Sequence, residues 1–309
     1  MMKTMTNPVR KHYHIEPETD RVIRRPDGTL FALGRHVNHD PRSRRFAFRA
    51  QQATLAPVFH ERHVPIFDQG SLGSCTGNAA LGILATGPYW DAEPQSWHDN
   101  GPLGNTGRIP WSEPGAVTLY SMLTAADDYP GTYPPDDTGS DGLTAAKVLT
   151  SLGIVPGYQH TFSLTDALQA LQHFPLLVGT EWLDNMFYPN NVGIIRASGP
   201  VDGGHEWIVD EFVPAGRMPY APKVGPYPLS AKTDFIGGTT SWGTSFGLDG
   251  RFYLSVPDFG KLLAKDGDVI VLTSPNAPAP EPTPAPSPAD DADQALATAM
   301  HAWLEVKGL

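Results

Sequence analysis

The stretch that decides the fold reads Pro65-Ile66-Phe67-Asp68-Gln69-Gly70-Ser71-Leu72-Gly73-Ser74-Cys75-Thr76-Gly77-Asn78-Ala79-Ala80. A glycine-rich loop is followed by small and apolar residues, which predicts a helix over residues 74–84. Cys75 falls in the first turn of that helix, where unpaired N–H groups and the helix dipole lower the pKa of a thiol. Gly70 and Gly73 let the backbone come close to a substrate. A lone cysteine is more often a small buried hydrophobe, but this setting favours a nucleophile.

Two other groups complete a reaction centre around this thiol. Gln69 carries an amide N–H that, together with the backbone N–H of Cys75, could stabilise a developing oxyanion. A base follows 130 residues downstream, at His205 in the run Gly203-Gly204-His205-Glu206-Trp207-Ile208-Val209. The two glycines before it and the apolar residues after it predict a strand that opens at the histidine.

These blocks resemble the papain-like cysteine peptidases, whose nucleophile signature and downstream histidine have this order. A third block, residues 240–253, resembles the Asn-Ser-Trp-Gly block of that family and its following Gly-Tyr pair. The resemblance implies an α+β fold of two lobes: a helical lobe with Cys75 and a twisted, mostly antiparallel sheet lobe with His205, with a cleft between them. It implies amide hydrolysis through an acyl-enzyme, with no cofactor and a peptide or protein as substrate. Trp242 would shield the His205 contact.

The third block departs from the family at Thr240, which stands where the family has the Asn that orients the histidine. A threonine hydroxyl accepts a hydrogen bond but is shorter than an amide. The departure predicts a lower rate rather than a different fold, and the nearby carboxylates of Asp202, Glu206 and Asp210 are candidate replacements. A weaker match, residues 138–142, corresponds to a glycine-rich strip of the family, so Gly142 and its neighbours would pair with substrate backbone.

The composition sets outer limits on what the protein does. The chain has 309 residues, a net charge of −11 and one cysteine, so no intramolecular disulfide forms and a reducing compartment is favoured. No apolar run is long enough to span a membrane, and the first 14 residues lack the apolar core of a secretory signal. We therefore expect a cytoplasmic protein, in the host cytoplasm or the virion if phage-encoded. The form of the nucleophile block is most similar to the bacterial and bacteriophage branch of the family.

Four segments are expected along the chain: a basic leader (1–57), the peptidase domain (58–273), a proline-rich linker (274–289) and a short amphipathic helix (290–309). Residues 1–50 hold 11 of the 22 Lys and Arg residues but 5 of the 33 acidic residues. Such a leader suits either a nucleic-acid arm or a segment that folds against its own acidic body, and the second is favoured because no nucleic-acid motif is present. A removable propeptide is the less favoured reading. The terminal helix either binds a protein partner or folds back on the domain.

Secondary structure follows from periodicity and turn residues. Helices are expected at residues 74–84, 143–152 and 164–173, the last capped by Ser163 or Thr165. Strands are expected at 176–180, 206–213, 234–239, 251–254 and 268–272, with a turn at 26–28 and a strand-like piece at 29–33. The leader histidines His12, His14, His36 and His39 are expected to be solvated, and no ligand spacing predicts a metal site.

Two other functions compete with the peptidase hypothesis. The first is a papain-like fold used as a binding or structural module, possibly in a virion, with catalysis lost; Thr240 and the tethered helix favour it. The second keeps the chemistry but acts on a cell-wall peptide, and it ranks last because no wall-binding repeat is present. The intact trio of Cys75, His205 and Gln69 favours an enzyme.

Overall fold

The computed structural model describes residues 25, 28–29, 31–48, 53–217 and 232–273. The predicted turn, the linker and the C-terminal helix lie wholly or largely outside these residues. Contacts divide the chain into one unit that ends at Pro275 and a second one after it. Among the residues described, no helix is both long and apolar enough to cross a membrane.

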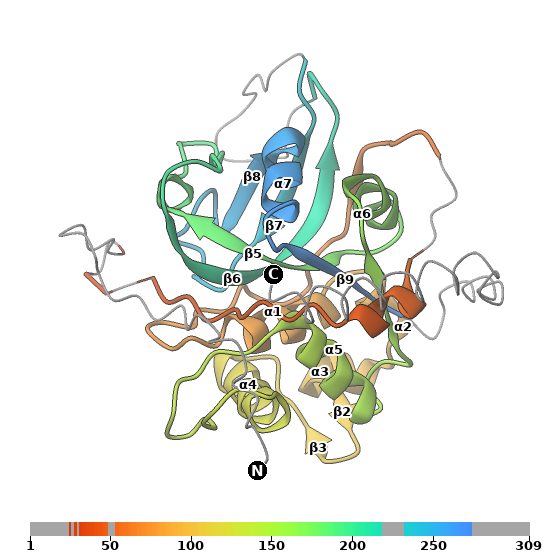
Figure 1. Cartoon of the computed structure of the whole chain (residues 1–309). Coiled ribbons are helices and arrows are strands. Elements are labelled where there is room, and N and C mark those ends of the chain that lie inside the picture. Colours follow the sequence, from red (N-terminus) through yellow and green to blue (C-terminus); the bar gives the residue numbers. More distant parts are fainter. Residues whose placement is uncertain (1–24, 26–27, 30, 49–52, 218–231, 274–309) are drawn as a thin grey trace, which may run out of the picture. The chain divides into compact units, whose positions relative to one another are not determined.

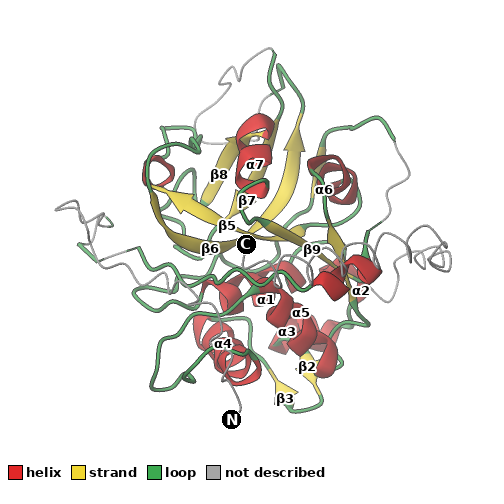
Figure 2. Ribbon diagram, in the orientation of Figure 1, coloured by secondary structure: helices red, strands yellow, loops and turns green. Residues whose placement is uncertain are grey.

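A curved antiparallel sheet forms the upper half of the first unit in Figures 1 and 2. Its strand order is β4-β9-β5-β6-β7-β8, and β1 pairs with β6. The strands are β1 (Val58–Phe59), β4 (Tyr158–Thr161), β5 (Leu176–Leu183), β6 (Val201–Val213), β7 (Phe235–Thr239), β8 (Arg251–Ser255) and β9 (Asp268–Leu272). A separate small hairpin joins β2 (Leu103–Gly104) to β3 (Gly107–Arg108).

Helices occupy the other half and two flanks of the sheet (Figure 2). They are α1 (Cys75–Leu84), α2 (Tyr89–Ala92), α3 (Gln95–Asn100), α4 (Glu113–Ala126), α5 (Gly142–Ser151), α6 (Leu164–Leu171) and α7 (Val256–Leu263). Short 3₁₀ helices cover Pro41–Phe46 and Asp184–Phe187. Every residue of α1 is buried, and Gly77 allows the close approach of α4, because a Cβ there would lie 2.8 Å from the backbone nitrogen of Tyr120.

The sheet separates two apolar cores because successive strand residues point to opposite faces. On β6, Trp207 and Val209 belong to the core under α6 and α7, whereas Ile208 belongs to the core under α1, α4 and α5. The same alternation sends Val178 to the first core and Leu177 to the second. By this register Glu206 faces the helices. The α+β architecture expected from the sequence is therefore the one observed.

Most element boundaries agree with the sequence-based prediction to within a few residues. Strand β6 begins earlier than predicted, at Val201, and Ser163 caps α6 by accepting from the N–H of Asp166 at 3.0 Å. Helix α4 was not predicted, since its first turn contains Pro and Gly. The strand-like piece at 29–33 is wrong: its described residues carry no strand, and the only bridge nearby joins Arg35 to Ser140.

Candidate active site

Cys75 begins α1, and its thiol is fully buried at the junction of that helix with the sheet. The loop before it is held by Asp137, whose carboxylate accepts from the N–H of Gly73 at 2.9 Å. Burial raises the pKa of the Cys75 thiol to about 12. Hydrogen bonds from the backbone N–H groups of Glu206, Gly34 and Thr76 lower this pKa but do not offset burial. The thiol is therefore neutral in this state.

His205 lies in β6, directly before the residue whose N–H contacts the Cys75 thiol. Its ring stacks on Trp242, with centroids 4.4 Å apart, and meets the edge of Trp182 at 5.1 Å. Burial lowers the pKa of His205 to about 3. Neither ring nitrogen has a hydrogen-bond partner among the described residues. The fold thus brings the backbone of β6 to Cys75, but in this state the imidazole packs on the tryptophans of the core that includes α6 and α7, and it makes no hydrogen bond with the thiol.

Thr240 and Gln69 flank this pair without making the contacts predicted for them. Thr240 follows β7, and its hydroxyl has no hydrogen-bond partner among the residues described, so it does not orient His205 in this state. The Gln69 amide donates to the carbonyl of Leu72 at 2.6 Å, and its oxygen accepts from Ser241. Their catalytic roles stay predictions.

A part of the leader runs across the junction. We call residues 31–36 the crossing segment; in Figure 1 it passes between the sheet and α1. The N–H of Arg35 donates to the Gly204 carbonyl at 3.0 Å, on the sheet side. On the helical side, the N–H of His36 donates to the Ser140 carbonyl at 2.8 Å, and the N–H of Ser140 donates to the Gly34 carbonyl at 2.9 Å.

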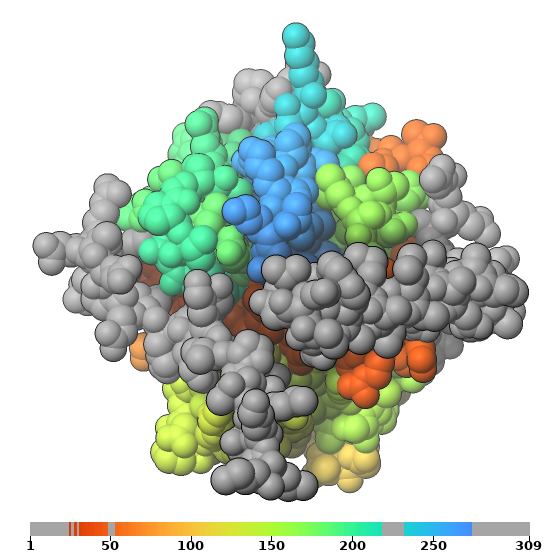
Figure 3. Space-filling view, in the orientation of Figure 1, coloured from red at the N-terminus to blue at the C-terminus, as the bar shows by residue number. Residues whose placement is uncertain are grey.

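The crossing segment also engages the predicted oxyanion donor and the tryptophan. The carbonyl of Ala32 accepts from the side-chain nitrogens of Gln69 and Trp242, each at 3.3 Å. In the space-filling view, red atoms of this part of the chain show at the boundary between the sheet half and the helical half (Figure 3). The burial of Cys75 is therefore achieved in part by the chain's own leader.

One solved structure supports the same architecture, and a second is reported beside it. Xylellain, a cysteine protease from Xylella fastidiosa, aligns over 82% of this chain and 99% of its own, with a TM-score of 0.54 and 15% identity. The proform of the ragweed cysteine protease Amb a 11 aligns over 82% of this chain and 69% of its own, with a TM-score of 0.49 and 14% identity. No protein-family model and no curated protein matches the chain.

The fold is papain-like. At 15% identity the likeness to xylellain establishes the fold and not the activity. The papain-like fold does locate the sequence blocks: the nucleophile block ends at the start of α1, and the histidine block forms β6. The Thr240 block follows β7.

Within this papain-like fold, the glycine-rich strip pairs with the crossing segment, and its predicted pairing with substrate backbone stays a prediction. Ser140 rather than Gly142 exchanges backbone hydrogen bonds with the crossing segment. Gly142 begins α5 and lies against Glu206, because a Cβ on it would lie 2.5 Å from Glu206 Oε1. Ser140 lies within the predicted strip of residues 138–142, but which residue of the strip makes the bonds could not be predicted, since hydrogen bonds of backbone groups do not depend on side-chain type.

Two polar side chains, those of His36 and Asp210, differ from what the sequence predicts. His36 was expected to be solvated, and that is wrong: its ring is buried, stacks on Tyr129 and hydrogen-bonds to the carbonyl of Thr138. Asp210 does not assist His205, because it forms an ion pair with Arg251. No group of three or more metal-ligating side chains was found in the described part of the chain.

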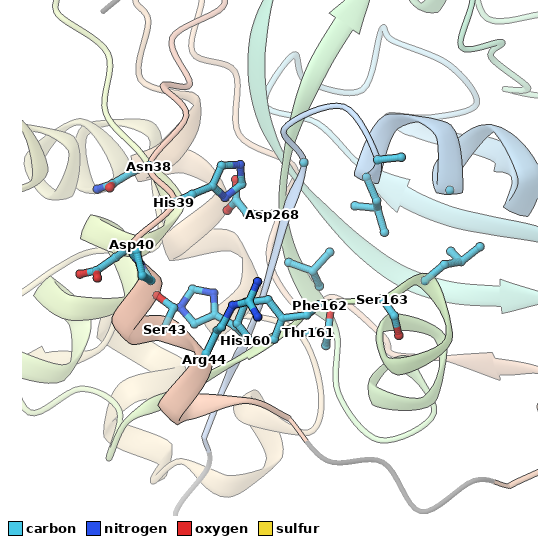
Figure 4. Close-up of a pocket in the computed structure, with 17 residues that line it drawn as sticks. Asn38, His39, Asp40, Ser43, Arg44, His160, Thr161, Phe162, Ser163 and Asp268 are labelled. Atoms are coloured by element: carbon cyan, nitrogen blue, oxygen red, sulfur yellow. The ribbon is translucent and has the colours of Figure 1, made fainter. Parts of the chain in front are cut away.

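A cavity of about 520 Å³ lies beside the ends of β4 and β9 (Figure 4). It is lined by residues 38–41, 43 and 44, the end of β4, the start of α6, the end of α7 and the start of β9. Neither Cys75 nor His205 lines it, but Asp268 does. Asp268 also forms an ion pair with the buried side chain of Arg35.

Proposed function

We propose that this chain is a cysteine-type peptidase that cleaves peptide bonds through an acyl-enzyme on Cys75. The observation that carries the proposal is the position of Cys75 as the first residue of a buried helix, at the junction with the strand that bears His205. The papain-like fold supports it, because that fold is shared with solved cysteine proteases.

The chemistry would proceed in two balanced stages. His205 takes the thiol proton, the sulfur attacks the substrate carbonyl carbon, and the Cys75 N–H and Gln69 amide stabilise the oxyanion. The C–N bond breaks as His205 returns the proton to the leaving amine. Water, deprotonated by His205, then attacks the thioester, releasing the carboxylic acid product and the free thiol. Thr240 would orient the imidazole once the crossing segment has left and the ring can move.

The origin, location and partners of the protein are proposed from the sequence resemblance alone. A bacterial or bacteriophage origin and a location in the cytoplasm of the host, or in a virion, are our expectations. So is a protein partner for the C-terminal helix, which lies outside the described residues. The substrate would be a peptide or protein.

A second candidate is a papain-like binding or structural module that has lost catalysis. The specific observation in its favour is the absence of a hydrogen-bond partner for both ring nitrogens of His205 among the described residues. A neutral thiol and a neutral imidazole with no bond between them are not an activated pair. The two candidates differ in what happens when the crossing segment is released.

The test uses the full chain with Gly34→Ala, a change designed to release that segment. The protein is reacted with an epoxide-type thiol inactivator at neutral pH, and the adduct is followed by intact mass. We expect labelling faster than that of a free cysteine, loss of the adduct in Cys75→Ala and slow labelling in His205→Ala. Labelling of Gly34→Ala at the free-cysteine rate, unaffected by His205→Ala, would support the binding module instead.

A further inference from the structure

The side chain of Arg35 enters a buried acidic cluster beside Cys75. It is 1% exposed, forms an ion pair with Asp268 and donates to the carbonyl of Asp266 at 2.7 Å. Burial would lower the pKa of the guanidinium, but the charges of Asp268, Glu206 and Asp141 raise it on balance. A fully buried cation is costly unless it is paired, so this cluster is built to hold one.

The cluster offers more acceptors than Arg35 uses. Glu206 is 0% exposed, and neither of its carboxylate oxygens has a hydrogen-bond partner among the described residues. The Nε of Arg35 is likewise without a partner. A buried carboxylate without a hydrogen-bond partner lies next to the guanidinium. The site therefore has acceptor oxygens that Arg35 does not use.

Two glycines make the room for a guanidinium. A Cβ on Gly179 of β5 would lie 2.5 Å from Arg35 Nε and 2.7 Å from Glu206 Oε2. A Cβ on Gly142 of α5 would lie 2.5 Å from Glu206 Oε1 and 3.0 Å from Asp268 Oδ2. Any side chain at either position would enter the space between the carboxylates. The walls come from both halves of the fold.

The cluster is adjacent to the reacting group through the backbone. Glu206 follows His205 directly, and the N–H of Glu206 contacts the Cys75 thiol. Gly34, next to Arg35, contacts the same thiol through its own N–H. A chain that lies in this path therefore brings its backbone to Cys75 and, one residue away, its side chain to the carboxylates.

From this geometry we infer that Glu206 and Asp268 form a guanidinium-binding specificity pocket, which selects peptide substrates with an arginine next to the residue at Cys75. The inference rests on the proposed peptidase function, and Arg35 of the leader is the pocket's resident occupant. Arginine suits the pocket better than lysine because its planar fork presents several N–H donors to two carboxylates at once. Asp268 also lines the cavity shown in Figure 4.

The test measures binding, so that it does not depend on catalysis. A labelled peptide with the sequence of residues 31–37 is titrated into full-chain Arg35→Ala, which leaves the pocket without its occupant, and fluorescence anisotropy is read. The comparison peptide carries citrulline in place of arginine, which keeps the shape and removes the charge. We expect the arginine peptide to bind at least about tenfold more tightly, because a site built to pair with a polar group rejects the analogue that lacks it.

Matched variants locate the effect. Adding Asp268→Asn should bring the ratio of the two peptides' dissociation constants towards one. Asp99→Asn makes the same change at an exposed position of α3 and should leave this ratio unchanged. Equal binding of both peptides, or no binding of either, would overturn the inference and make Arg35 a purely structural ion pair. Tight binding of the arginine peptide without any hydrolysis would leave the pocket standing and remove the peptidase proposal.

A second measurement leaves Arg35 unchanged, in case Arg35→Ala does not fold. Epoxide inactivators built on the same arginine and citrulline peptides are reacted with the Gly34→Ala chain, in which the crossing segment is released, and adduct formation at Cys75 is followed by intact mass. Preferential labelling by the arginine compound supports the pocket. Equal rates for the two compounds contradict it.

Discussion

At the scale of single residues, His205 is the group whose protonation state should report on the crossing segment. Burial lowers its pKa to about 3, well below the ordinary value of 6.5. A base with a depressed pKa in the folded state stabilises that state above its unfolded pKa, and this contribution is lost as the pH falls. The window therefore runs from about pH 6.5 down to about pH 3.

We expect the free energy of unfolding to fall through this window by up to about 1.4 kcal/mol per pH unit from His205 alone. The measurement is urea unfolding at a series of pH values for the native chain and for His205→Gln. The slopes should differ by the His205 contribution, while the lowered pKa values of His60 and His160 affect both proteins alike. Identical slopes would mean that His205 is hydrated in solution.

Thr240 allows a second prediction at this scale. Its hydroxyl has no partner in the described structure, and a longer amide would reach further towards the imidazole. In the Gly34→Ala chain we expect Thr240→Asn to raise kcat/KM on a peptide substrate by roughly tenfold, a small part of what a positioned acid–base group contributes. Steady-state kinetics with Thr240→Val as the control should show a rate below that of threonine. A valine variant as active as the threonine form would show that His205 is not oriented from this position.

At the scale of elements, the crossing segment fits between α1 and β6 only because Gly34 lacks a side chain. A Cβ there would lie 2.6 Å from the carbonyl carbon of Gly73, a backbone atom that no rotamer change can move. The overlap falls in the loop immediately before the nucleophile. One added methyl group should therefore expel the segment and spare the body of the domain.

The expected result for Gly34→Ala is faster labelling of Cys75 by a small thiol reagent than in the native chain. The matched control is Gly157→Ala, where a Cβ would meet only Thr273 Oγ1 at 3.4 Å. That variant should label at the native rate. If Gly34→Ala labels no faster, the segment tolerates the methyl group by shifting, and another part of the structure must bury Cys75.

The elements also show what the sequence could predict and what it could not. Cys75, Gln69 and His205 could be predicted because their neighbours in the sequence indicate the local structure: a helix start, a glycine-rich loop and a strand that opens at a histidine. The role of Arg35 could not be predicted from its neighbours, because its partner Asp268 lies 233 positions away and only the folded sheet brings the two together. The sequence did favour a leader that folds against its acidic body, and the Arg25–Asp68 and Arg35–Asp268 pairs agree with that reading.

At the scale of the whole molecule, the crossing segment joins the two halves of the fold. Arg35 donates to Gly204 in the sheet half, and His36 donates to Ser140 in the helical half. Removing one partner of a buried ion pair costs about 3–5 kcal/mol when the other charge stays buried. Here the remaining carboxylates can regain water if the segment detaches, so the loss is limited to the free energy that holds the segment in place.

Because the loss cannot exceed the free energy that holds the segment in place, the effects of substitutions in the crossing segment on the free energy of unfolding should not be additive. Gly34→Ala and Arg35→Ala should each lower the free energy of unfolding, and the double variant should be no less stable than the less stable single variant. Residues that act as one unit show such coupling, whereas independent sites add. Urea unfolding of the four proteins measures it, and Gly34→Ala combined with Gly157→Ala supplies the additive control. Full additivity of the first pair would mean that the segment stays bound when either contact is lost, and that release of the leader cannot be what exposes Cys75.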